Sequence, residues 1–198
     1  MSKFKILNEI LSSRQKRIFV LSAPSGTGKS TLSKKLVKDP DLNCILSVSY
    51  TTRKPRKGEK DGVDYVFIER KKFEKMILEN QFLEHAEVHG CYYGTNQNFV
   101  KDQIKKGCHV LLDIDVQGAK QIRKAIPTAV LIFIRPPSFE SLKERLRNRG
   151  TEDETAINLR LKNAEKEMKE VKIYDHVIVN DKFNKAYQDL KRVIQQSF

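Results

Sequence analysis

The feature that most constrains the fold of this chain is a glycine-rich loop placed between an apolar run and a helical pattern. Residues 17–35 read RIFVLSAPSGTGKSTLSKK. The run before the loop is rich in β-forming residues, and Leu32 and Leu36 follow the loop on one predicted helix face. The loop itself, APSGTGKS at 23–30, has the P-loop pattern with alanine in the first position. The sequence therefore predicts a strand, a phosphate-binding loop and a helix in succession.

The small and polar residues of this loop each have a physical role. Gly26 and Gly28 permit the backbone bend that points successive N–H groups at phosphate oxygens, and the following helix adds the positive end of its dipole. Lys29 can reach the β- and γ-phosphates of a nucleotide, and the Ser30 hydroxyl can coordinate Mg²⁺. Ala23 lies at the strand end, where a methyl group is tolerated if φ is negative. The predicted phosphate-binding residues are Ala23, Pro24, Ser25, Gly26, Thr27, Gly28, Lys29 and Ser30.

Strands and helices alternate along most of the remaining chain. The segments CHVLLDID (108–115) and AVLIFIR (129–135) are almost continuously apolar, as expected for strands of a parallel sheet that helices cover on both faces. The predicted fold class is therefore α/β, with a three-layer parallel-sheet core. Further strands are predicted at 17–23, 44–50 and 175–180, and helices at 96–106, 116–125, 138–148, about 153–171 and the C-terminus.

The stretch 48–97 interrupts this alternation. It is polar where Pro55, Gly58 and Gly62 indicate loop structure. Short strands at 64–69 and 82–90 surround a helix at 71–81. We predict a core domain of residues 1–47 and 98–198, a small mixed-sheet insert at 48–97, and a mobile helical lid at about 138–171 within the core.

Charge and cysteine content narrow the class of protein. The chain carries 38 basic and 25 acidic residues, a net charge of +13, which suits a polyanion such as a nucleotide or a nucleic acid. Cys44, Cys91 and Cys108 contain no CxxC pair, so neither a disulfide framework nor a zinc site is expected. His85 and His89 lie on a predicted strand, where a four-residue spacing does not make a metal-binding face. We expect a reducing, cytoplasmic location.

The N-terminus, MSKFKILNEILSSRQKR, is basic and mildly amphipathic. It lacks the roughly 7–15-residue apolar region of a signal peptide, and we expect a short leading helix there. No apolar run in the sequence approaches the roughly 18 residues needed to cross a bilayer, so no membrane partner is expected. The sequence makes no prediction of oligomeric state.

A second phosphate-binding site is suggested within the insert. Arg53 and Arg56 lie in a proline-containing polar loop, with Tyr65 and Tyr93 downstream. Two guanidinium groups and two phenolic hydroxyls could clamp a terminal phosphate. Taken singly, each of these side chains also fits a solvated surface position.

Five segments, in this order and spacing, carry a resemblance to a known family. They are APSGTGKST, SVSYTTRKPRKGEKDGVDYVF, FLEHAEVHGCYYGT, LLDIDVQG, and RLRNRGTEDE followed by INLRL. Over nearly the whole chain the sequence resembles guanylate kinases, a family of P-loop nucleoside monophosphate kinases. The run TTRxPRxGExxGxDY is far more discriminating than the P-loop. The resemblance implies the reaction ATP + GMP ⇌ ADP + GDP with Mg²⁺, with dGMP as a further acceptor, in purine nucleotide metabolism and GMP recycling.

The matching motifs also imply acceptor-binding residues. They imply GMP-phosphate contacts at Ser49, Arg53, Arg56, Tyr65 and Tyr93, and guanine contacts at Glu84, Thr95 and Asp115. Chemistry supports the base assignment, because guanine presents N1–H and N2–H donors together and a carboxylate such as Glu84 can accept both. A hydroxyl such as that of Thr95 can donate to O6. A buried carboxylate left unpaired by the wrong base would cost about 1–3 kcal/mol.

Two aspartates end the most apolar predicted strand. Asp113 and Asp115 occupy its carboxyl end, and carboxyl ends of parallel strands face the ligand crevice. Asp115 also fits the N-cap of the next helix. We assign Asp113, with Ser30, to the Mg²⁺ shell. Asn180 and Asp181, after the last strand, are candidates for contacting adenine.

The predicted helix at 138–148 carries a stripe of leucines and arginines. Leu142, Arg145, Leu146 and Arg149 are spaced by three and four residues and therefore share one face. Arg160 could join these arginines from the next helix. The residues alone leave structural salt bridges equally open, whereas the resemblance implies lid arginines that bind the transferring phosphate. The predicted catalytic residues are Lys29, Arg145, Arg149 and Arg160.

Three other kinds of protein are alternatives to a guanylate kinase. A guanylate-kinase-like protein-binding module need not keep a phosphate loop, but this chain retains the glycine–lysine–serine of residues 28–30. A nucleic-acid-binding protein would have a continuous basic stripe rather than arginines that converge on a cleft, so nucleic acid is not expected as a partner. A kinase for another nucleoside monophosphate is disfavoured by Glu84 and Thr95.

Overall fold

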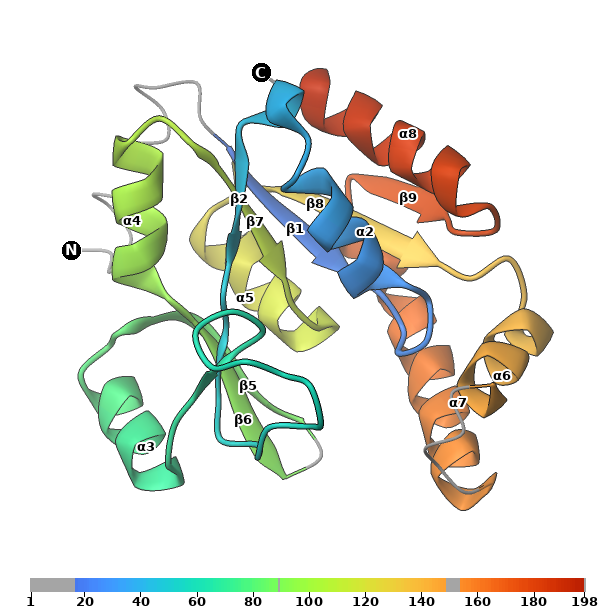
Figure 1. The fold of residues 1–198 in the computed structure, drawn as a ribbon, viewed down its shortest axis with the longest axis horizontal. Helices are drawn as coiled ribbons and strands as arrows, with labels where there is room; N and C mark the ends of the chain where they lie inside the picture. Colours follow the sequence, from blue (N-terminus) through green and yellow to red (C-terminus); the bar gives the residue numbers. More distant parts are fainter. Residues whose placement is uncertain (1–16, 89, 149–153, 198) are drawn as a thin grey trace.

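The computed structural model describes residues 17–88, 90–148 and 154–197. The predicted leading helix, His89 and Arg149 lie outside these residues. Five parallel strands form the centre of the molecule (Figure 1). Their order in space is β2 (Cys44–Ser47), β7 (His109–Asp113), β1 (Ile18–Ser22), β8 (Val130–Arg135) and β9 (His176–Val179).

Helices cover both faces of this sheet because its strands are apolar on both sides. Phe19 and Leu21 of β1 pack in the cluster that contains α2 (Lys29–Leu36) and α8 (Phe183–Gln195). Ile18 and Val20 point the other way, toward α4 (Gln97–Lys105) and α5 (Val116–Ala125). Since successive residues of a strand alternate between faces, a continuous apolar run requires two covered faces. The predicted three-layer core is confirmed.

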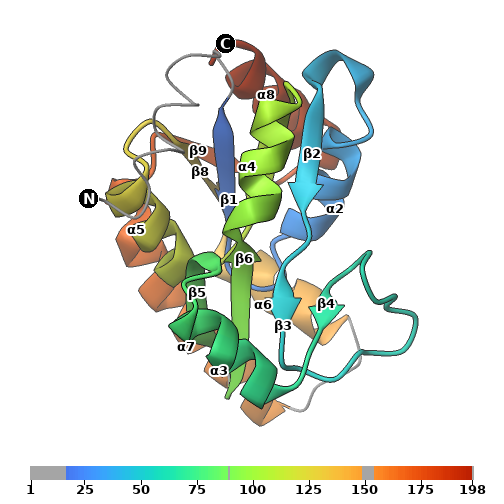
Figure 2. The same cartoon turned by 90° about the vertical axis from the view of Figure 1, so that its left-hand side faces the viewer.

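A second, mixed sheet lies below the carboxyl ends of the parallel strands (Figures 1 and 2). Its order is β4 (Val66–Phe67), β3 (Tyr50–Thr51), β6 (Cys91–Asn96) and β5 (Phe82–Val88). β3 is parallel to β4 and antiparallel to β6, which is antiparallel to β5. The helix α3 (Arg70–Leu78) packs on this sheet through a cluster built on Phe73, Met76 and Phe82.

The insert differs from the sequence prediction in three strands. The predicted strand at 44–50 divides between the two sheets, because β2 ends at Ser47 and β3 begins at Tyr50. The strand predicted at 64–69 is reduced to Val66–Phe67. β6 was not predicted, and its sequence, CYYGTN, contains a glycine where a side chain would collide with the rings of Phe73 and Phe82. Glycine weakens the strand signal, but here it makes room for the aromatic cluster.

The lid region forms two packed helices with a small core of their own. The helices are α6 (Phe139–Arg147) and α7 (Glu154–Lys169), and a 3₁₀ turn at Glu170–Ile173 follows α7. Leu142, Leu146, Ile157 and Ala164 are buried between them. No helix within the described residues is both long enough and apolar enough to span a bilayer.

Candidate active site

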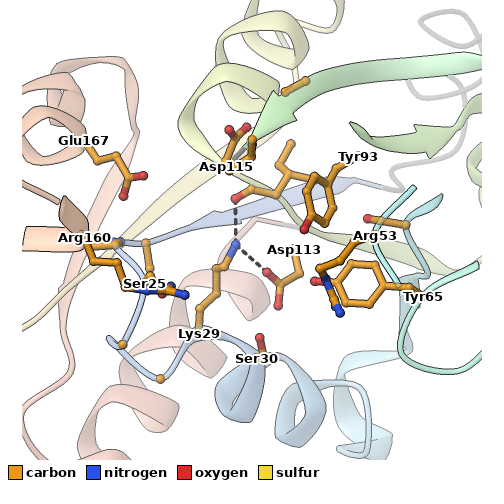
Figure 3. A pocket seen from close by; sticks show the side chains of 18 of the residues that line it. Ser25, Lys29, Ser30, Arg53, Tyr65, Tyr93, Asp113, Asp115, Arg160 and Glu167 are labelled. Atoms are coloured by element: carbon orange, nitrogen blue, oxygen red, sulfur yellow. Dashed lines mark hydrogen bonds and ion pairs between the residues drawn. The ribbon is translucent and has the colours of Figure 1, made fainter. Parts of the chain in front are cut away.

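A cavity of about 340 Å³ opens at the carboxyl ends of the parallel strands (Figure 3). It brings together most of the residues predicted from the sequence, which are Ala23, Pro24, Ser25, Gly26, Gly28, Lys29, Ser30, Ser49, Arg53, Arg56, Tyr65, Glu84, Tyr93, Asp113, Asp115 and Arg160. Thr27 and Thr95 are fully buried and do not line it. Arg145 is half-buried on α6 and also lies outside the lining.

The P-loop connects β1 to α2 with two glycines in the left-handed region. Gly26 has φ of 94° and Gly28 has φ of 93°, which side chains other than glycine rarely adopt. Ala23 is not among the residues with positive φ in the described chain, so the alanine at the first position causes no strain. Asn180, from the loop after β9, donates its amide to the Thr27 carbonyl at 2.7 Å and is itself buried. This contact fixes the turn of the loop.

The lid helices rest directly on the same loop. A Cβ at Gly26 would lie 2.9 Å from one Leu146 methyl carbon and 3.1 Å from one of Leu142. On α7, the Arg160 guanidinium donates to the Ser25 hydroxyl at 2.6 Å. Gly26 therefore both forms the turn of the loop and leaves room for α6 to pack on it. Arg160 lines the cavity, at the position that the family resemblance implied.

Lys29 is held at the start of α2 by two groups on the strand β7 side. Its ammonium group is 2.5 Å from Asp113 Oδ1 and donates to the Ile114 carbonyl at 2.9 Å. The Ser33 hydroxyl, one turn later on α2, donates to Asp113 Oδ2 at 3.1 Å. Asp113 is thus oriented by α2 from two sides, and it presents Lys29 to the cavity (Figure 3).

The phosphate clamp predicted in the insert is preorganised by a carboxylate. Both terminal nitrogens of Arg53 donate to Glu59 at 2.9 Å, and Glu59 also accepts from the Arg56 backbone N–H at 2.7 Å. The hydrogen bond from Arg53 holds the pKa of Glu59 below its usual value. Arg53 lies over the Tyr65 ring at 5.2 Å, and the Tyr65 and Tyr93 rings meet edge to face at 5.9 Å. Side chains from within β6 and from the loop between β3 and β4 therefore converge.

The predicted guanine site contains a buried carboxylate. Glu84 on β5 is 3% exposed, and the Thr95 hydroxyl on β6 donates to its Oε1 at 2.6 Å. Burial raises the pKa of Glu84 to about 7, and the Thr95 hydrogen bond opposes that rise. Gly118 of α5 lies against the carboxylate, since a Cβ there would overlap it. Asp115 caps α5 by accepting from the Gly118 N–H at 2.8 Å, as predicted, and also lines the cavity.

Comparison with known proteins agrees with this geometry. The family model for guanylate kinase matches residues 15–197. The chain is 48% identical to a guanylate kinase of Rickettsia bellii over 90% of this chain and 93% of that protein. The chain belongs to the guanylate kinase family. A guanylate kinase of Rickettsia felis is also 48% identical, over 89% and 92% of the two chains. The crystal structure of a guanylate kinase from Anaplasma phagocytophilum superposes with a TM-score of 0.77 at 37% identity, covering 91% of this chain and 85% of that one.

Membership of the guanylate kinase family confirms the resemblance seen in the sequence motifs.

Two residues of the cavity are suited to binding Mg²⁺. The described residues contain no group of three or more His, Cys, Asp or Glu placed to hold a metal ion. Ser30 and Asp113 both line the cavity and offer a hydroxyl and a carboxylate oxygen. Mg²⁺ is commonly bound by one or two carboxylates together with substrate phosphates and water, so these two donors fit it.

Two residues of the site, Glu59 and Glu167, were not assigned from the sequence, and a third, Asn180, was assigned a different contact. Glu59 holds both arginines of the clamp, and its place in the TTRxPRxGE run was the available signal. Asn180 stays a candidate for contacting adenine, and its amide also donates to the P-loop backbone, a contact that the sequence did not predict. Glu167 on α7 lines the cavity, and no periodicity or motif in the charged segment around it distinguishes it from its neighbours.

Proposed function

We propose that this member of the guanylate kinase family transfers the γ-phosphoryl group of ATP to GMP, giving ADP and GDP. The observation that carries the proposal is one cavity lined both by a P-loop and by a buried carboxylate that a threonine hydroxyl orients. The P-loop is suited to the phosphates of the donor, and the carboxylate is suited to guanine. In this proposal the core domain, 1–47 and 98–198, binds ATP, and the insert, 48–97, binds GMP.

Selection of guanine rests on the hydrogen-bonding pattern of the base. When it is ionised, Glu84 accepts from N1–H and N2–H of guanine. The Thr95 hydroxyl, which donates to Glu84 Oε1 at 2.6 Å, would have to turn away from that carboxylate to donate to O6. Adenine places an acceptor, N1, where the carboxylate needs a donor. Because Glu84 is 3% exposed, water cannot substitute for the missing donor. A mismatch at a buried charged group costs about 1.5–3 kcal/mol, which corresponds to roughly a tenfold to hundredfold preference for GMP over AMP.

The phosphate of GMP is bound at the other end of the insert. Arg53 is held by Glu59 with its guanidinium plane fixed, and Arg56 is exposed beside it with its backbone anchored to the same carboxylate. Ser49, Tyr65 and Tyr93 provide hydroxyl donors; these three also line the cavity. A clamp that is ordered before the ligand arrives loses less entropy on binding.

The donor phosphates are bound by the loop backbone and by Lys29. The lysine is already placed by Asp113 and the Ile114 carbonyl, and its ammonium group transfers to the β- and γ-phosphates when they bind. Ser30 and Asp113 would hold Mg²⁺. The bound cation supplies charge neutralisation at the phosphate oxygens.

The chemistry needs positioned charge rather than a general base. The nucleophile is a phosphate oxygen of GMP, which is already anionic near neutral pH. In-line transfer then depends on alignment and on cations that stabilise the transferring group, which we assign to Lys29, Arg145, Arg149 and Arg160. Closure of the lid, about 138–171, and of the insert excludes water and prevents hydrolysis of ATP.

The same arrangement suggests a wider acceptor range and a cellular setting. The base and the phosphate have the largest sets of assigned contacts, so dGMP is expected to be an acceptor as well. We place the activity in purine nucleotide metabolism and GMP recycling in the cytoplasm. In support, the three cysteines form no disulfide with one another.

A coupled assay of ADP production tests the proposal. GMP, AMP, UMP and dTMP are offered as acceptors with ATP and Mg²⁺, and strong preference for GMP is expected. Lys29→Ala should abolish turnover with the fold intact, and Lys38→Ala, an exposed lysine just after α2, serves as the matched control. Equal use of AMP and GMP would contradict the base assignment. Full activity of Lys29→Ala would contradict the assignment of the P-loop.

A further inference from the structure

One carboxylate in the cavity has no role in the proposed reaction. Glu167 lies on α7, seven residues after Arg160 and therefore on the same face of the helix. Its Oε2 atom is buried and has no hydrogen-bond partner among the described residues. Figure 3 shows the carboxylate turned toward the interior of the cavity, on the side where Asp115 and Arg160 lie.

Glu167 stands at the junction of two hollows. It lines the main cavity and also a neighbouring one of about 380 Å³ between α7, the start of α5 and the end of β5. Ser25, Val88, Asp115 and Arg160 line both hollows as well. A ligand that extends from Asp115 into either hollow would therefore come beside this carboxylate.

The buried Oε2 atom of Glu167 would be stabilised by a hydrogen-bond donor. Burial raises the pKa of Glu167 to about 7, with the charge of Lys29 opposing the rise. A buried polar atom without a partner costs free energy. By contrast, Glu165 two residues earlier is exposed and pairs with Lys169 at 3.5 Å. Glu167 is thus placed to accept from a ligand rather than from the protein.

The donor can be identified from the chemistry of the acceptor nucleotide. Its phosphate offers only acceptors when ionised, and its N1–H and N2–H are assigned to Glu84. The remaining donors that a carboxylate could bind are the second N2–H, for which Asp115 is the assigned guanine contact, and the ribose hydroxyls. The ribose joins the base to the phosphate, and so lies between the guanine site and the phosphate clamp. Asp115, at the guanine end, and Glu167 both line the cavity, and Figure 3 shows Glu167 on the side of Asp115 that faces away from Tyr93.

We propose that Glu167 accepts a hydrogen bond from the ribose hydroxyls of the acceptor nucleotide and thereby sets the preference for GMP over its deoxy analogues. The inference rests on the proposed function, because it takes GMP as the acceptor. It makes α7 a part of the acceptor site, so that the lid recognises the sugar while the insert recognises the base and the phosphate.

Steady-state kinetics with GMP, dGMP and 3′-deoxy-GMP test the proposal. The wild-type protein should prefer GMP over at least one deoxy analogue by roughly tenfold in kcat/KM, the effect of one hydrogen bond to a charged group. In Glu167→Ala that preference should fall to within about twofold. Glu167→Gln should retain part of it, because the amide oxygen still accepts. Glu165→Ala, on the exposed side of α7, is the matched control and should behave as wild type.

Several outcomes would overturn the inference. One is a Glu167→Ala variant that loses activity equally on all three acceptors, since that indicates a structural role. Another is a change in preference between ATP and 2′-deoxy-ATP instead, since the hydroxyl would then belong to the donor. The inference would also fail if the wild-type protein had the same kcat/KM for all three acceptors. If GMP is not phosphorylated at all, the proposed function fails first. If GMP is phosphorylated without this coupling, only the role of Glu167 fails.

Discussion

Replacement of Gly118 by alanine should separate guanine recognition from stability. Gly118 lies in the first turn of α5, and a Cβ there would lie 3.1 Å from Glu84 Cδ and closer still to Oε2. The Glu84 carboxylate is buried and bound by the Thr95 hydroxyl at 2.6 Å, so any shift away from the added carbon strains or breaks that hydrogen bond. The added carbon cannot move away from Glu84 freely, because Ile114 Cδ1 lies 3.2 Å from it. The carboxylate must therefore leave its present position.

Opposing effects make the change in stability small. Alanine is preferred to glycine in a helix by about 1 kcal/mol, whereas overpacking a buried site costs about 1–3 kcal/mol. The net change in the free energy of unfolding should thus be a loss of no more than about 2 kcal/mol. A displaced Glu84 loses at least one charged hydrogen bond to guanine, worth about 1.5–3 kcal/mol. The KM for GMP should then rise at least about tenfold.

The assay is initial-rate kinetics with GMP and ATP varied separately, beside thermal unfolding. The KM for ATP should stay within about twofold, because the P-loop is untouched. Lys124→Ala, at an exposed position of the same helix, controls for changes in α5. In a Glu84→Gln background, Gly118→Ala should cost less GMP affinity than it does alone. A folded Gly118→Ala protein with an unchanged KM for GMP would refute the reasoning.

Three further predictions concern the other parts of the site. Burial raises the pKa of Glu84 to about 7, so the ionised form that accepts hydrogen bonds is gained as pH rises. Inhibition by guanosine, which carries no phosphate, should therefore strengthen roughly tenfold from pH 6 to pH 8. A flat pH profile, or the same profile in Glu84→Gln, would count against this prediction. Glu59→Gln should raise the KM for GMP about threefold to tenfold with the KM for ATP unchanged, because Arg53 loses its ion pair with Glu59. An equal rise in both KM values would indicate a general structural effect. Asn180→Ala should raise the KM for ATP roughly tenfold while the KM for GMP changes little, because the substitution leaves the Thr27 carbonyl without its donor. Unchanged ATP kinetics would show that the loop holds its shape without the amide.

The core sheet could be predicted because its signal is local. The strand β7 reads HVLLD, with its first four residues fully buried, and such a run is stable only with helices on both faces. The P-loop is equally local, since its geometry follows from glycines at fixed positions in a single turn. The helix at 116–125 was predicted with the same bounds as α5. Its capping residue, Asp115, was identified from its position before the helix.

The insert was harder to predict because its strands depend on tertiary contacts. Residues 44–50 form one apolar run in the sequence, yet the chain leaves one sheet after Ser47 and enters another at Tyr50. Nothing in the periodicity of the run marks that change. In β6, Gly94 is not a residue typical of strands. It is needed there because a side chain would collide with the rings of Phe73 and Phe82. Short strands in a small sheet are specified by such packing more than by propensity.

Within the candidate site, residues that carry charge at fixed motif spacing were predictable, and residues that hold them were not. Arg53 was identified from its motif, but the role of Glu59 depends on a loop that folds back over six residues. Gly118 and Glu84 are 34 positions apart in the sequence, and only the packing of α5 on β5 brings them together. The positions of supporting residues are set by tertiary structure, on which single-sequence patterns carry little information.

The two ends of the insert are attached to the core with very different strength. At the base end, the Gln121 side chain donates to the His85 carbonyl at 2.7 Å and accepts from the His85 N–H at 3.2 Å, so it pairs with β5 as a neighbouring strand would. His85 follows Glu84 directly, so this pairing fixes the distance between Glu84 and α5. At the phosphate end, Lys34 of α2 meets Asp64 at 2.8 Å, and the lysine side chain is 61% exposed. Such a pair contributes about 0–1 kcal/mol. We therefore expect the phosphate end to move at little cost while the base end keeps its contacts with α5. The proposed arginine clamp could then close on its ligand without disturbing the proposed guanine site.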